Sequence, residues 1–143
     1  MSDINEKDGG IGRYDFIDMM SQKTGLKRQA TAFGTNTVAE GGGLLVSHEL
    51  MLEGTDFNLI YFPLRHLGYK LVVRTIAGIF ASGGIPKAIS FTTGMSTRFG
   101  KSQAGELMEG IKLAAKKYEL DVKFFDFIPS VTGLTLSCTA WGY

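Results

Sequence analysis

The sequence is poor in cysteine, in net charge and in long apolar runs. Its 143 residues contain a single cysteine, so no disulfide can form within the chain. The formal net charge of +1 gives no reason to expect binding to nucleic acid or to a membrane surface. No apolar run approaches the ~20 residues that span a bilayer. The N-terminus is polar and acidic, unlike a signal peptide, and we therefore expect a cytoplasmic protein.

The composition suits one globular domain of ordinary size. Hydrophobic residues make up 44% of the chain and charged residues 20%, which is enough apolar material for a packed core. The 19 glycines are scattered, which is typical of many tight turns. We predict a flexible tail over residues 1–10 and a single domain over residues 11–143.

Apolar periodicity predicts three helices. The clearest covers residues 102–118, where apolar residues recur at steps of three and four and Ser102 is placed to cap the start. A second is predicted from Pro63 to about Ser82, before the glycine pair that follows. A short amphipathic helix is predicted near Tyr14, ending at Gly25.

Four segments predict strands: residues 44–52, 87–95, 121–127 and 132–143. In the last of them Cys138 lies on the apolar side of the alternation, where it is expected to pack and not to react. Helices and strands mix along the chain without a regular alternation. The pattern predicts an α+β fold with one sheet and helices on one face.

Four segments together resemble the N-terminal domain of thiamine-monophosphate kinase, in the superfamily of aminoimidazole ribonucleotide synthetase and selenophosphate synthetase. They read LMLEGTDFNLIYFPLRHLGYK, IFASGGIPKAISF, ELMEGIKLAAKKY and SVTGLTLSCTAWG. The resemblance covers residues 11–143 and implies that two copies pair through their sheets into a β-barrel-like core. It also implies ATP and Mg²⁺ held by aspartates from several segments. The C-terminal domain that normally completes such an enzyme is absent from this sequence.

Most of the acidic positions that the resemblance marks are changed here. The early glycine-aspartate-aspartate turn of the family falls on Gly34, Thr35 and Asn36, and the helical asparagine and aspartate fall on Thr75 and Gly78. None of these side chains is anionic, whereas Mg²⁺ prefers carboxylate and phosphate oxygens. The resemblance therefore implies a site that has lost much of its charge.

Some positions of the family site are retained. Glu49 stands at a strand aspartate of the family, Glu53 matches directly, and Asp126 keeps the aspartate of a later glycine-glycine-aspartate. The two glycines of that motif are Phe124 and Phe125 here. The remnant ATP–Mg²⁺ positions are thus Asn36, Glu49, Glu53 and Asp126, with Glu49 and Asp126 as the metal candidates.

Three functions remain open from the sequence. The first is a degenerate, stand-alone and non-catalytic homodimer with a binding or regulatory role, which uses no cofactor. The second is the ATP–Mg²⁺-binding part of a kinase that needs a second domain or a second polypeptide. The third is a small-molecule or peptide binder that reuses the former cleft, now lined by Phe124 and Phe125. Phosphoryl transfer depends on electrostatic support from metal ions, and we expect no kinase activity from this chain alone.

Overall fold

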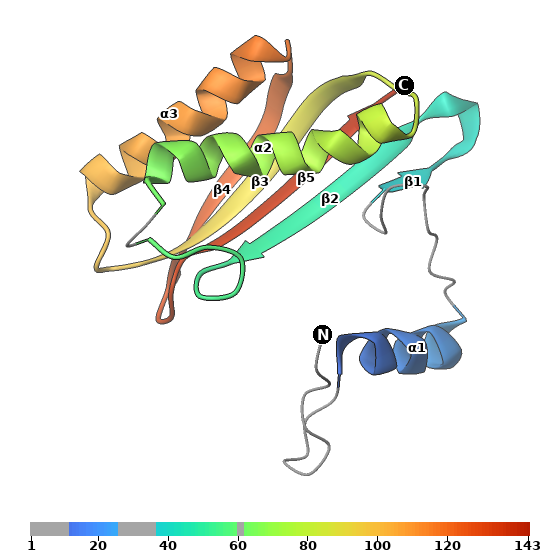
Figure 1. Cartoon of the computed structure of the whole chain (residues 1–143), viewed down its shortest axis with the longest axis horizontal. Helices are drawn as coiled ribbons and strands as arrows, with labels where there is room; N and C mark the ends of the chain where they lie inside the picture. The colour runs from blue at the N-terminus through green and yellow to red at the C-terminus, as the bar shows by residue number, and fades with distance from the viewer. Residues whose placement is uncertain (1–11, 26–36, 60–61) are drawn as a thin grey trace.

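The computed structural model describes residues 12–25, 37–59 and 62–143, and these form one mixed sheet with three helices (Figure 1). None of the helices in these ranges is long and apolar enough to cross a membrane. The elements in chain order are α1 (Arg13–Thr24), β1 (Thr37–Ala39), the 3-10 helix η2 (Gly41–Gly43), β2 (Leu45–Leu52), α2 (Leu64–Ala81), β3 (Pro86–Ser96), α3 (Lys101–Lys117), β4 (Asp121–Ser130) and β5 (Thr135–Gly142).

The strand order in the sheet is β1-β2-β5-β3-β4. β5 is antiparallel to both of its neighbours, with Glu49 opposite Cys138 on one side and Phe91 opposite Cys138 on the other. β3 and β4 are parallel, because the chain crosses between them through α3. The last strand of the chain thus lies in the middle of the sheet, and β4 forms one edge.

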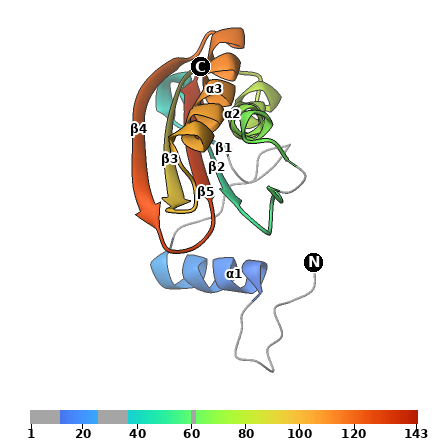
Figure 2. The same ribbon diagram turned by 90° about the vertical axis from the view of Figure 1, so that its left-hand side faces the viewer.

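The helices α2 and α3 cover one face of the sheet, and none of the described elements packs over the other, which we call the bare face (Figure 2). In β3 and β5 alternate residues point toward the helices and are almost fully buried, as are the inward side chains of α2 and α3. The edge strand β4 is exposed along nearly its whole length. The predicted single sheet with helices on one face is confirmed, with α2 and α3 as those helices. The core includes Met51, Leu67, Leu71, Ile76, Ile79, Ile89, Leu107, Ile111, Leu134, Leu136 and Cys138.

Two glycines allow α2 and α3 to approach closely. A Cβ atom on Gly110 would lie 1.8 Å from the carbonyl oxygen of Arg65, and one on Gly68 would lie 2.2 Å from that of Leu107. Neither position has room for a side chain. The two helices therefore pack with backbone against backbone, which keeps the covering layer tight.

The ends of the helices differ in detail from the sequence predictions. Gly100, and not Ser102, is the N-cap of α3, and its N–H donates to the side-chain oxygen of Gln103 at 2.9 Å. α1 ends at Gly25 as predicted, with a positive φ of 72°. Its apolar residues do not reach the core, since Tyr14 is 55% exposed and no residue of α1 is buried. In both views α1 lies apart from the sheet (Figures 1 and 2).

Candidate functional site

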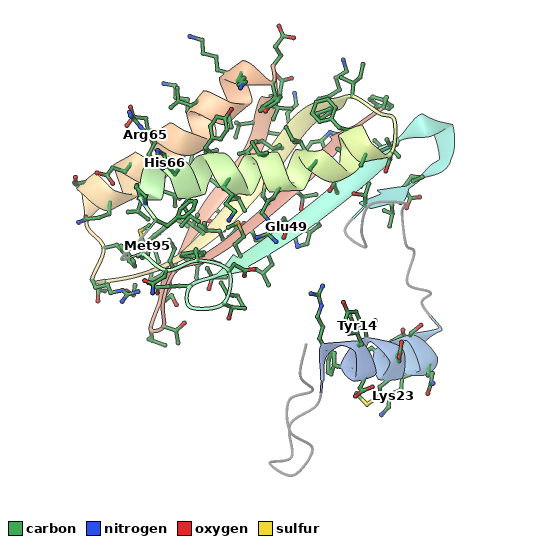
Figure 3. All side chains as sticks on the ribbon, viewed as in Figure 1. Tyr14, Lys23, Glu49, Arg65, His66 and Met95 are labelled. Carbon is green, nitrogen blue, oxygen red and sulfur yellow. The ribbon has the colours of Figure 1, made fainter. Side chains whose placement is uncertain are left out.

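Glu49 lies on the covered face of β2 and is held by an arginine from α2. Its Oε1 atom is 2.6 Å from Nη2 of Arg74, and its side chain is only 15% exposed. The other terminal nitrogen of Arg74 is 3.7 Å from Oδ1 of Asp56. Figure 3 shows Glu49 beneath α2, at the centre of the molecule. The arginine thus stands between two carboxylates that come from β2 and from the turn after it.

Asp126 lies on the opposite face of the sheet. It is paired with Thr92 in the β3–β4 ladder, while the neighbouring pair of Phe91 and Phe125 points toward the helices. Its Oδ1 atom accepts the N–H of Phe127 at 2.8 Å. The side chain is exposed to solvent at the bare face.

The structure does not bring the two predicted metal ligands together within one chain. β5 and β3 lie between β2 and β4, so the strands of Glu49 and Asp126 are about 14 Å apart, and their side chains point to opposite faces. Among the described residues, no three histidine, cysteine or acidic side chains gather where they could hold a metal ion. The donors present do not fit Mg²⁺, which needs several oxygen ligands around one point.

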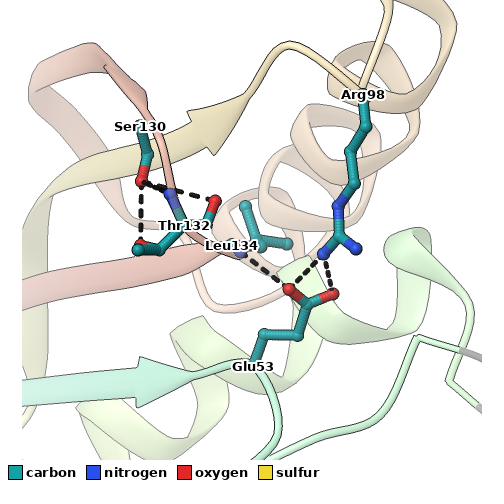
Figure 4. A network of polar contacts seen from close by, with 5 residues as sticks. All are labelled: Glu53, Arg98, Ser130, Thr132 and Leu134. Atoms are coloured by element: carbon teal, nitrogen blue, oxygen red, sulfur yellow. Dashed lines mark hydrogen bonds and ion pairs between the residues drawn. The ribbon is translucent and has the colours of Figure 1, made fainter.

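Glu53 joins three loops at the far end of the sheet (Figure 4). Its carboxylate accepts from Arg98, in the loop before α3, and from the N–H of Leu134 at 3.1 Å, at the start of β5. Gly133 passes so close that a Cβ atom there would lie 2.0 Å from Oε2 of Glu53. Glu53, a predicted nucleotide position, therefore has a structural role. Its carboxylate is already bound by partners from the same chain.

The remaining positions that the resemblance marks carry uncharged side chains. Asn36 and the turn before it lie outside the described residues. The hydroxyl of Thr75 donates to the carbonyl of Leu71 at 2.7 Å, and Gly78 is buried. Thr75 also hydrogen-bonds to the thiol of Cys138. Burial raises the pKa of that thiol to about 11, the bond to Thr75 lowers it in part, and Glu49 raises it.

Phe124 and Phe125 do not line one cleft, because neighbouring residues of a strand point to opposite faces. Phe125 stacks on Phe91 with ring centroids 5.9 Å apart and borders an apolar groove of about 520 Å³ between β4 and α3. Phe124 pairs with Ser90 and is 59% exposed on the bare face. The predicted cleft with both rings in its wall is therefore wrong.

A family model decides the relationship of this chain. The model described as AIR synthase related protein, N-terminal domain, matches residues 28–143. The chain belongs to this family.

Two curated relatives are thiamine-monophosphate kinases. The enzyme of Bacillus subtilis (strain 168) is 28% identical over 106 residues, which is 74% of this chain and 33% of the relative. The enzyme of Rhodopirellula baltica is 29% identical over 93 residues, which is 65% of this chain and 29% of the relative. The chain thus spans about a third of the length of the curated relatives that it matches.

Solved structures bear out the fold. The thiamine monophosphate kinase of Aquifex aeolicus superposes with a TM-score of 0.81 at 20% identity, over 92% of this chain and 42% of that one. A structure described as AaThiL complexed with AMPPCP and TMP gives 0.78 at 20% identity, over 91% and 41%. A HypE-HypF complex gives 0.69 at 13% identity, over 89% and 41%. The resemblance to the N-terminal domain of thiamine-monophosphate kinase is thereby confirmed.

The residues alone predict that Glu49 and Asp126 are either solvated or paired with an arginine or lysine. The structure pairs Glu49 with Arg74 and leaves Asp126 exposed. The sequence does not identify Arg74 and Arg98 as the particular partners of Glu49 and Glu53. The signal in the sequence is weak, since Arg74 and Glu49 are 25 positions apart and belong to different elements. An arginine next to the lost helical ligands was the one available hint.

Proposed function

We propose that this chain is a non-catalytic homodimer with a binding or regulatory role, which works without ATP or Mg²⁺. The proposal is supported by the ion pairs and the positions of the retained acidic residues. Glu49 is paired with Arg74, and Glu53 with Arg98, while Asp126 faces the other side of the sheet. A triphosphate needs cations or several cationic donors to offset its charge, and these carboxylates would repel it.

A titration of ATP and Mg²⁺ into the full chain tests the absence of nucleotide binding. We expect no saturable heat at millimolar ATP, with or without Mg²⁺, and no phosphate transfer to thiamine monophosphate. Magnesium-dependent, saturable binding would overturn this part of the proposal. It would support the second candidate, a nucleotide-binding part that needs a second domain or another polypeptide.

The bare face of the sheet supports the proposed dimer. Its middle strands present threonine and serine, but its flanks present large apolar side chains. Leu50 is 49% exposed and Leu52 38% exposed on β2, and Phe124 and Ile128 are 59% and 54% exposed on β4. An apolar sheet face of this kind is usually covered by another layer, and a second copy would supply one.

A pair of matched substitutions tests the dimer. Leu50→Asp changes the bare face, and Leu113→Asp changes the outer surface of α3, where Leu113 is 47% exposed. We expect sedimentation at micromolar concentration to show a dimer for the unchanged chain and for Leu113→Asp, and a monomer for Leu50→Asp. A monomeric unchanged chain would refute the dimer and leave the nucleotide result untouched.

A further inference from the structure

A large hollow lies along the edge of β2. β1 pairs only with Leu45, Val46 and Ser47, so no described strand pairs with that edge from His48 to Leu52. The hollow has a volume of about 720 Å³ and mixes apolar, cationic and acidic side chains. Among its lining residues are His48, Glu49, Leu50, Asp56 and Arg74. Its charged wall includes Glu49, Asp56, Arg74 and Arg13 of α1. The proposed function uses the pair of Glu49 and Arg74 but leaves unexplained why the arginine lies between two acids.

The two acids of this wall are held in place by the fold. Asp56 accepts the N–H of Leu52 at 2.7 Å through Oδ2, which leaves Oδ1 directed toward Arg74. Glu49 is fixed by the β2–β5 ladder and is mostly buried. Both carboxylates are partly removed from water, where an anion without a partner is costly.

Arg74 meets this need from α2. Its guanidinium is planar and carries five donors, so that one nitrogen can bind Glu49 while the other faces Asp56. The position between two fixed carboxylates is also where a divalent cation would gain most from them. An ion could reach this point only by displacing the guanidinium, which would leave Arg74 beside a like charge.

We propose that Arg74 is a resident cation that takes the place of a metal ion between Glu49 and Asp56. The hollow then binds no divalent cation. A ligand in it would contact the guanidinium of Arg74 where a metal site would present a hydrated ion. This inference deepens the proposed function and rests on it for the absence of metal chemistry. It also predicts that removal of the arginine uncovers a cation site.

Titration with Mn²⁺, followed by the signal of free Mn²⁺ in electron paramagnetic resonance, tests the inference on the full chain. We expect no saturable binding to the unchanged protein or to Arg74→Lys. Arg74→Gln is expected to bind one ion per chain at least about tenfold more tightly than either of these proteins, because the position between the two carboxylates is then open to an ion. The double variant Glu49→Gln with Arg74→Gln is expected to lose that site again.

Thermal unfolding supplies a second readout. At a Mn²⁺ concentration about ten times its Kd, we expect the Tm of Arg74→Gln to rise by about 4 °C, and that of the double variant to stay unchanged. If Arg74→Gln alone fails to fold while the double variant folds, the arginine is needed to balance Glu49, as proposed. If both variants fail to fold, the arginine acts through packing and the inference is wrong.

Two results would overturn the inference directly. One is saturable Mn²⁺ binding by the unchanged chain that Glu49→Gln abolishes, since the arginine would then block nothing. The other is a folded Arg74→Gln variant that binds no Mn²⁺. Neither result depends on the titration with ATP, so the inference and the proposed function can fail separately.

Discussion

Along β2, the covered and bare faces of the sheet differ more in what lies over them than in how apolar their residues are. On the covered face Met51 and Leu136 are fully buried under α2 and α3. On the bare face Leu50 and Leu52, from the same strand as Met51, are 49% and 38% exposed. The covered side of β2 carries Ser47 and Glu49 as well as Met51, and the bare side is at least as apolar, so the sequence pattern could not tell which side forms the core. The helices decide that question.

Truncation of one leucine on each face should give the largest contrast. We expect Leu136→Ala to lower the free energy of unfolding by about 2–5 kcal/mol, because it leaves a cavity in the core. Leu50→Ala should lower it by less than about 1 kcal/mol in a monomer, because that side chain is half exposed. Urea unfolding of both variants measures the difference. If both variants lose the same free energy of unfolding in a chain shown to be monomeric, another part of the same chain must cover the bare face.

The close packing of α2 against α3 can be tested at two glycines of α3. Gly110→Ala should destabilise the fold by about 3 kcal/mol, because the added methyl group meets the backbone of α2. Gly105→Ala lies on the same helix with nothing within 4 Å and should stabilise it by about 0.5–1 kcal/mol. A lower Tm for Gly110→Ala and a higher Tm for Gly105→Ala would confirm that the backbone contact at Gly110 fixes the distance between α2 and α3. Two similar effects would show that the helices can separate without loss.

The thiol on the covered face should give the smallest effect, visible only at high pH. The pKa of Cys138 is raised from 9.0 to about 11, so the unfolded chain loses this proton first. Its contribution is fully present below pH 9 and is lost as the pH rises through 11. Relative to Cys138→Ala, we expect the unchanged chain to lose about 2 kcal/mol of stability over that window. A parallel pH dependence of the two proteins would mean that the thiol is open to water.

Local patterns predicted the elements well, and their lateral arrangement poorly. The stripe from Ala104 to Tyr118 predicted α3 because a helix with one apolar side has a period that the sequence shows directly. No such signal shows that β5 separates β2 from β3, which is what keeps Glu49 and Asp126 apart. The ion pair of Glu49 with Arg74 depends on how α2 lies over the sheet. Distances of this kind arise from packing, which a single sequence does not display.

The position of β5 has a consequence for how the chain is made. β2 and β3 share no hydrogen bonds with each other, and each is joined to the sheet core through β5, which covers Thr135–Gly142. During synthesis the β1–β2 pair and the β3–α3–β4 unit leave the ribosome before the strand that links them. Until β5 is made, the inner edges of β2 and β3 lack the strand that pairs with them, and unpaired edges of this kind are prone to pair with other chains.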